Sequence, residues 1–305
     1  MMIEIRRPIG VPVVYALMAM SLQGCANIQM AANVYQPSPL CKEIISGNVD
    51  RAMQLVKQGE DVNAATGCAL LRAAERGQLE LVKLLLEHKA DPNRYVSAEL
   101  TPLKGAVMSR NVQMVQILLE GGASPRDDIG AFQVVLNFSD IEMAELLLRH
   151  GANANMTIPV KETVYAFPDG QMVAVQRRDL EPDRIDNTVK RLQCRISTLS
   201  GGSSLLYLAA GSGREPEANS RIAKLLIDRG ADPNARTLNG STPLMFAASQ
   251  HNHRVMTILM DAGANVEAMD RCGRMAADYA VLFPQHQRAD LAPQTRALLQ
   301  DRHSK

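Results

Sequence analysis

The sequence contains no tryptophan, few other aromatic residues and no excess of charge of either sign. Phenylalanine and tyrosine make up 4% of the chain, which suits a core of leucine, alanine, valine and methionine better than a β-sandwich or barrel. Lysine and arginine number 33 against 32 aspartates and glutamates, a formal net charge of +1. Since nucleic-acid binding needs a basic face, the composition gives no support for a nucleic-acid partner.

The residue patterns that carry catalysis are missing as well. The sequence has no glycine-rich phosphate loop, no Gly-x-Ser-x-Gly elbow and no His-Glu-x-x-His zinc motif. It has no Cys-x-x-Cys pair, and the His251-x-His253 pattern stands alone between two expected helices. We therefore predict that the protein is not an enzyme, and that it holds no metal or cofactor and takes no small-molecule substrate.

The apolar run near the N-terminus is too short to cross a membrane. It extends from Val11 to Leu22 and follows Arg6 and Arg7. A membrane-spanning helix needs about 20 apolar residues, whereas a signal peptide has a basic start and an apolar stretch of about 7 to 15 residues. The run ends in Leu22-Gln23-Gly24-Cys25, which resembles the bacterial lipobox, where cleavage precedes a cysteine that is then acylated.

This resemblance implies a lipoprotein signal peptide over residues 1–24, a lipid on Cys25 and a short tether over residues 25–36. Because Ala26 rather than aspartate follows the cysteine, the sorting rule of lipoproteins implies the outer membrane, facing the periplasm. The alternatives are an ordinary signal peptide and a plain anchor helix.

One helix–turn–helix pattern recurs seven times along the chain. A clear copy begins at Thr242-Pro243-Leu244 and ends at Gly263-Ala264-Asn265. Each copy is too small to bury its own apolar face, so the copies must stack on one another. The equivalent first position of the seven units is occupied by Ser38, Cys68, Thr101, Gly130, Ser204, Thr242 and Met275.

The pattern resembles the ankyrin repeat, a unit of about 33 residues that begins T-P-L-H-x-A. The resemblance rests on Thr101-Pro102-Leu103, on Thr242-Pro243-Leu244, on the weaker Ser38-Pro39-Leu40 and on closing turns such as Ala90-Asp91-Pro92-Asn93. The fourth unit departs from it, with Gly130-Ala131-Phe132. The resemblance implies an all-α repeat solenoid over residues 37–305 that binds a protein partner through its concave face and finger loops.

Local helix signals agree with this register. Serine or threonine before proline predicts an N-cap followed by a proline in the first turn, where its missing N–H has no cost. Glycines close the second helices, where a left-handed residue is favoured. These glycines are Gly122, Gly151, Gly230 and Gly263.

The register is interrupted once, between the fourth and fifth units. The connection there is about 41 residues longer than the others, which defines an insertion over residues 159–200 in a finger loop. Its first half, Thr163–Val175, contains two β-like runs around a Pro-Asp-Gly turn and predicts a β-hairpin. Residues 191–197 alternate polar and apolar and could add a third strand. The insertion is either a tolerated surface loop or an extension of the binding surface.

Four cysteines remain once Cys25 is set aside: Cys41, Cys68, Cys194 and Cys272. An even number in an oxidising compartment permits two disulfides with three possible connectivities. Cys41 and Cys68 begin adjacent units, so they are the pair expected to approach. The alternative is that all four are small buried hydrophobic residues with free thiols.

Three functions fit these features: an envelope adaptor that holds a protein client, an immunity lipoprotein that inhibits a toxin acting in the periplasm, and a structural envelope protein. We rank them in that order. Apolar anchors and arginines are typical of protein interfaces. The candidate partner-contacting residues are Tyr165, Phe167, Met172, Arg177 and Arg178 in the insertion, and Lys104, Tyr207 and Met245 in the repeats.

Overall fold

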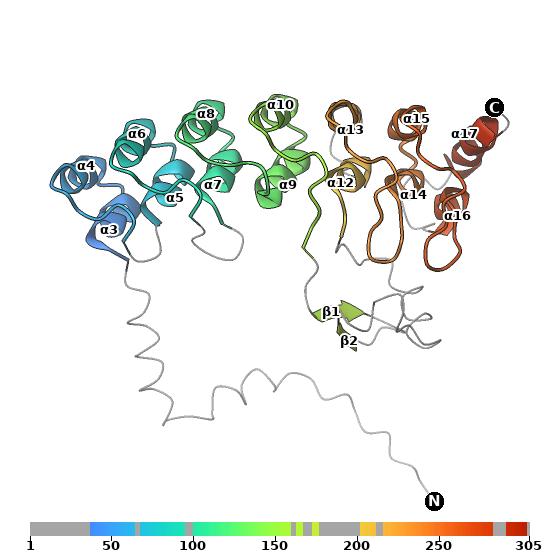
Figure 1. The fold of residues 1–305 in the computed structure, drawn as a ribbon, viewed down its shortest axis with the longest axis horizontal. Helices are drawn as coiled ribbons and strands as arrows, with labels where there is room; N and C mark the ends of the chain where they lie inside the picture. The colour runs from blue at the N-terminus through green and yellow to red at the C-terminus, as the bar shows by residue number, and fades with distance from the viewer. Residues whose placement is uncertain are drawn as a thin grey trace, which may run out of the picture.

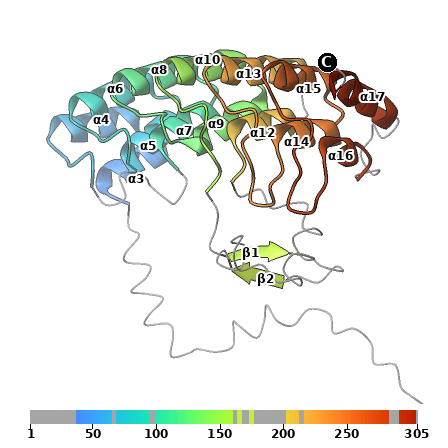
Figure 2. The same cartoon turned by 45° about the vertical axis from the view of Figure 1, so that its right-hand side comes forward.

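The computed structural model describes residues 37–64, 68–94, 100–159, 163–166, 173–176, 202–211, 216–282 and 291–303. Within these ranges the chain forms fourteen helices that pair into seven helix–turn–helix units, stacked side by side as an arch (Figures 1 and 2). The repeat solenoid predicted from the sequence is confirmed.

The first helices of the units lie in the inner layer of the arch (Figure 2). They are α3 (Pro39–Ser46), α5 (Cys68–Glu75), α7 (Pro102–Met108), α9 (Ile129–Phe138), α12 (Leu205–Gly211), α14 (Pro243–Ser249) and α16 (Ala276–Leu282). The second helices form the outer layer. They are α4 (Val49–Lys57), α6 (Leu79–Glu87), α8 (Val112–Glu120), α10 (Ile141–Arg149), α13 (Pro216–Asp228), α15 (His253–Asp261) and α17 (Ala292–His303).

The predicted caps hold at three of the inner helices. The side chains of Ser38, Thr101 and Thr242 each accept a hydrogen bond from a backbone N–H of the first turn, and a proline follows each of them. The fourth unit differs, because Asp128 caps α9 and accepts from Ala131 N at 2.9 Å. Helix α9 therefore begins at Ile129. Its N-cap lies two residues before Gly130, the residue to which the repeat register assigned the capping position.

The core lies between the two helix layers and runs continuously through all seven units. Second helices contribute leucines at equivalent positions, and small alanines in the first helices let the neighbouring helices approach closely. Burial of these side chains stabilises the stack only when a neighbouring unit is present. The equivalent buried leucines are Leu85, Leu118, Leu147, Leu226 and Leu259.

The stack continues past the insertion without a change of register. Asn155 Nδ2 donates to Gly230 O at 2.9 Å, and Asp232 N donates to Asn155 Oδ1 at 2.8 Å. Asn93 makes the same pair of bonds to Gly122 and Ser124 within the first four units. The base of the insertion is closed by pairing of Ile158 N with Ser203 O and of Gly202 N with Ile158 O, both at 2.9 Å.

The insertion carries the predicted hairpin. Strands β1 (Thr163–Ala166) and β2 (Val173–Gln176) pair antiparallel, with Thr163 opposite Gln176 and Ala166 opposite Val173. The hairpin lies on the side of the arch toward which the finger loops project (Figures 1 and 2). The third strand expected at 191–197, the signal peptide and the tether lie outside the described residues.

Among the helices that the structure describes, none combines the length and apolar character that a membrane span requires.

Candidate protein-binding face

Three residues of the repeats were predicted to contact a partner, and for Met245 this prediction is wrong. Its side chain is only 1% exposed, and its sulfur accepts a weak hydrogen bond from Thr242 N at 3.4 Å. Met245 belongs to the buried core, so its contribution is to packing. Lys104 and Tyr207 are each partly exposed on their inner helices.

The partner contacts proposed for residues of the insertion remain predictions. Tyr165 lies within β1. Phe167, Met172, Arg177 and Arg178 lie outside the described residues.

Tyr207 belongs to an aromatic pair that sequence reasoning did not find. Its ring stacks on that of Phe246 in the next unit, with centroids 4.5 Å apart and planes 7° apart. Phe246 also lies over Gly211, where an added Cβ would be 1.9 Å from Phe246 Cε1. Burial, followed by the proximity of Tyr279, raises the pKa of Tyr207 well above its usual range, so its phenol stays neutral.

Three large apolar side chains are exposed at the C-terminal ends of inner helices in the first four units. Ile45 on α3 is 42% exposed, Met108 on α7 is 50% exposed and Phe138 on α9 is 40% exposed. We call these three residues the apolar row. Sequence reasoning missed them, although apolar residues directly before the turn between two helices were a usable signal. Exposed apolar side chains that lie together, rather than singly, are typical of interaction surfaces.

Arginines lie beside the apolar row. The Arg110 guanidinium lies 5.4 Å from the centroid of the Phe138 ring, a cation–π contact. The same group is 3.9 Å from Asp140, a long and mostly solvated ion pair. Arg76 donates to the backbone oxygen of Ile45 at 2.6 Å. The row is therefore bordered by positive charge.

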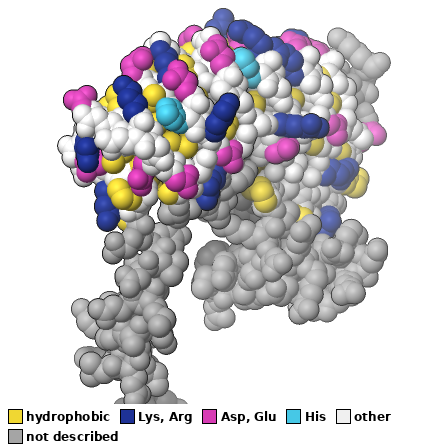
Figure 3. All heavy atoms as spheres, turned by 60° about the vertical axis from the view of Figure 1, so that its left-hand side comes forward, with side chains coloured by type: hydrophobic (Ala, Val, Ile, Leu, Met, Phe, Trp, Pro, Cys, Tyr) yellow, Lys and Arg dark blue, Asp and Glu magenta, His cyan; other side chains and the backbone are white. Residues whose placement is uncertain are grey.

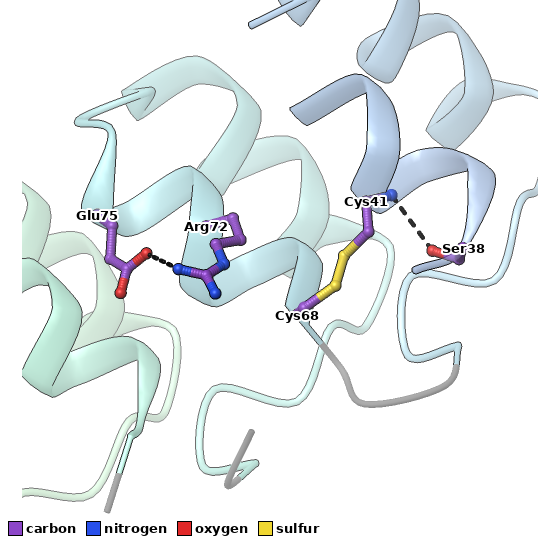
Figure 4. Close-up of a disulfide and its surroundings, with 5 residues drawn as sticks. All are labelled: Ser38, Cys41, Cys68, Arg72 and Glu75. Carbon is purple, nitrogen blue, oxygen red and sulfur yellow. Dashed lines mark hydrogen bonds and ion pairs between the residues drawn. A yellow bond between two sulfur atoms is a disulfide. The ribbon is translucent and has the colours of Figure 1, made fainter. Parts of the chain in front are cut away.

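A disulfide joins the first two inner helices. Cys41 on α3 and Cys68 on α5 are both buried and linked, with Cα atoms 6.3 Å apart (Figure 4). Cys272 is also disulfide-bonded. Cys41 and Cys68, the pair expected to approach, are therefore joined. The alternative, that the cysteines are free buried thiols, does not hold for Cys41, Cys68 or Cys272.

The finger loops of the last two units enclose a buried polar network. Asp270 accepts from Tyr279 OH and from Arg274 Nε, both at 2.8 Å, and Ser241 Oγ lies 2.6 Å from the same phenol. Burial, as the largest cause, raises the pKa of Tyr279 to about 12. The network lies inside the finger loops and connects the sixth unit to the seventh through hydrogen bonds, so its role is structural.

The described residues offer no cluster of three or more His, Cys, Asp or Glu side chains that could hold a metal ion. His251 Nδ1 and His253 Nε2 each lie 2.8 Å from Thr295 Oγ1 and thereby fix α17 against the sixth unit. On the face shown in Figure 3, basic and acidic side chains are interspersed with apolar ones.

Comparison with known proteins agrees with this architecture. The profile of the family described as ankyrin repeats (3 copies) matches residues 28–129, 172–270 and 206–289. The chain is 45% identical over 65 residues to a putative ankyrin repeat-containing protein of Treponema pallidum, covering 21% of this chain and 22% of that protein. It is 26% identical over 250 residues to human ankyrin repeat and SOCS box protein 16, covering 81% and 48%. The chain thus spans less than half the length of these relatives.

The crystal structure of the human ASB11 ankyrin repeat domain superposes with a TM-score of 0.56 at 23% identity, covering 87% of this chain and 98% of that one. This likeness concerns the fold. The family profile matches well over half of the residues. The chain belongs to the ankyrin repeat family.

Proposed function

We propose that this protein is a lipid-anchored adaptor of the bacterial envelope that binds a protein client on the periplasmic side. Ankyrin repeats mediate protein–protein interaction. The observation that carries the proposal is the apolar row, formed by Ile45, Met108 and Phe138 along the inner helices. None of these side chains belongs to the buried core, and contact with a partner would cover them.

The anchor and the compartment rest on the sequence at Cys25 and on the cysteines of the repeats. Disulfides persist in oxidising compartments such as the periplasm and are rare in the cytosol. Cys41, Cys68 and Cys272 are all disulfide-bonded, which supports an extracytoplasmic location. A lipid on Cys25 would hold the repeats near a membrane and raise their effective concentration for a client there.

The binding surface combines the inner helices with the insertion. The insertion leaves and re-enters the solenoid at one paired point, Ile158 with Gly202 and Ser203. Its hairpin lies on the side of the fingers, so a client on the inner helices of units four and five would also reach it. Residues 159–200 can be replaced by a short finger without changing the register of the stack.

The test is quantitative capture of one client from envelope extracts. The baits are the full mature protein, a Met108→Glu/Phe138→Glu variant, the chain with 159–200 replaced by a short finger, and a control with Arg229→Glu on the outer layer. We expect the full protein and the control to retain the client. The Met108→Glu/Phe138→Glu variant and the chain with the short finger should lose most of it. Equal recovery on all four baits would overturn the proposal.

The anchor is tested separately. Cys25→Ala should abolish acyl labelling and leave an unprocessed precursor in the membrane fraction. Normal maturation of that variant would remove the lipid anchor from the proposal.

A deletion strain distinguishes the adaptor from the other roles. Loss of activity of an envelope enzyme, restored by the wild-type gene and not by the Met108→Glu/Phe138→Glu variant, supports the adaptor. Killing of the deletion strain by sibling cells, with envelope activities intact, would replace the adaptor with an immunity protein.

A further inference from the structure

Charge is unevenly distributed along the inner helices of the solenoid. The inner helices α5 and α7 carry Arg72, Lys104 and the adjoining Arg76, and Arg110 follows in the turn after α7. By contrast, α9 (IGAFQVVLNF), α12 (LLYLAAG) and α14 (PLMFAAS) carry no charged residue. Ile45 and Met108 therefore lie on charged helices, Phe138 lies on the uncharged α9 beside Arg110, and the aromatic pair lies on two uncharged helices.

Three acidic residues near the apolar row are already engaged. Glu75 forms an ion pair with Arg72 at 2.7 Å (Figure 4). Asp128 and Asp140 cap α9 and α10, accepting from Ala131 N and Met143 N at 2.9 and 3.1 Å. These two carboxylates already bind backbone N–H groups at helix N-termini, where negative charge stabilises the helix.

The cations are less well compensated. The Lys104 ammonium makes no hydrogen bond or ion pair within the described residues, and it lies 3.1 Å from the point where a Cβ would stand at Gly130. That point is in the first turn of α9, the positive end of the helix, where a cation is unfavourable. Arg110 has only its long contact to Asp140 and its position over the Phe138 ring.

These observations combine a cationic border with exposed apolar side chains on adjacent helices. We infer that the surface formed by Lys104, Met108, Arg110 and Phe138 binds an acidic amphipathic segment of the client protein. Carboxylates of the segment would pair with Lys104 and Arg110, and its apolar side chains would contact Met108 and Phe138. The inference deepens the proposed function, on which it rests, by naming the chemistry of the partner.

Arg110 acts in both parts of this recognition. Because its guanidinium already lies over Phe138, little side-chain freedom remains to be lost when a carboxylate binds. A guanidinium also binds a carboxylate through two hydrogen bonds, which a lysine cannot do. Electrostatic complementarity of this kind contributes to partner choice and association rate.

The experiment uses the full mature protein and two fluorescent peptides of 18 residues. Both have leucine at helical i, i+4 and i+7 spacing, with glutamate at the remaining positions in one and lysine in the other. Fluorescence anisotropy gives the affinities. We expect the glutamate peptide to bind about tenfold or more tightly than the lysine peptide, with an affinity that falls as salt is raised.

Two variants with the same change in charge locate the site. Lys104→Glu/Arg110→Glu should weaken binding of the glutamate peptide by about tenfold or more. Lys57→Glu/Arg229→Glu on the outer layer should change it less than about twofold. If the first variant does not fold by circular dichroism, Lys104→Gln/Arg110→Gln and the salt dependence of the wild type provide the same test.

Three results would overturn the inference: equal affinity for both peptides, binding to neither, or binding to vesicles of an anionic phospholipid in place of the peptides. Its failure is distinguishable from failure of the proposed function. A client that is lost with Met108→Glu/Phe138→Glu and retained with Lys104→Gln/Arg110→Gln would leave the adaptor standing and remove the acidic segment.

Discussion

The units before and after the insertion are built on the same core and differ on the inner face. Leu85 and Leu259 occupy equivalent positions and are both fully buried. Among the first four units Ile45, Met108 and Phe138 are exposed and the inner helices α3, α5 and α7 carry charge. The inner helices of the fifth and sixth units carry none and hold the Tyr207–Phe246 stack. The repeat dictates what lies between the helix layers and leaves the inner face free to vary. Partner choice therefore resides in positions that the stack does not need.

A disulfide joins the first two inner helices of the part before the insertion, and the largest predicted effect tests how far its contribution extends. Replacing Cys41 and Cys68 by alanine should cost about 2–4 kcal/mol, because the disulfide no longer restricts the unfolded chain. In a solenoid each unit contacts only its neighbours, so the loss should concentrate in the first units.

Hydrogen exchange resolved by peptide measures this, since the chain has no tryptophan to report unfolding. We expect faster exchange in α3 to α6 and unchanged exchange in α14 and α15. Uniform acceleration along the whole chain would contradict a local role for the disulfide.

The next effect compares two inner-helix glycines. A methyl at Gly211 would meet the rigid Phe246 ring at 1.9 Å, whereas one at Gly130 would meet the flexible end of Lys104 at 3.1 Å. Gly211→Ala should therefore cost about 1–3 kcal/mol, and Gly130→Ala should be neutral or slightly stabilising by urea unfolding. In a Phe246→Ala background the cost at Gly211 should largely disappear. A persistent cost would show that the aromatic ring is not its cause.

The buried network of the last fingers gives a smaller effect with a pH dependence. Tyr279→Phe should cost about 1–2 kcal/mol, since Asp270 and Ser241 lose a hydrogen-bond partner. Burial raises the pKa of Tyr279 from 10.0 to about 12, so the unfolded chain loses this proton first as pH rises. Wild-type stability should fall between pH 10 and 12, and the fall should be shallower in Tyr279→Phe. Identical slopes in denaturant titrations across this window would contradict the assignment.

The smallest effect concerns the joint between the two parts. Asn155→Ala removes two exposed hydrogen bonds across the insertion, with an expected cost of about 1 kcal/mol. Asn93→Ala removes the same two bonds within the first part and is the matched control. Both variants should lose similar stability, but only Asn155→Ala should separate the unfolding of the two parts by hydrogen exchange. A single transition in both variants would mean that the helices alone couple the parts.

The fold was readable from the sequence because its signals are local. N-cap residues, prolines, closing glycines and the leucine spacing each act within one helix pair, and their phase located the insertion. The fourth unit misled this reasoning because Asp128, two residues before the expected position, supplies the cap. The binding face was less readable. Met245 looked available and is buried, while Met108, an equally apolar methionine, is exposed.

By itself, the sequence determined the number and phase of the repeats, the place of the insertion and its hairpin, since helix caps and apolar periodicity depend on residues within a few turns of one another. The tertiary structure decided that Cys41 is joined to Cys68, that Phe246 covers Gly211 and that the apolar row lies open beside Arg110. These features arise between units about 30 residues apart in the chain, where packing against the neighbouring repeat settles which side chains are buried.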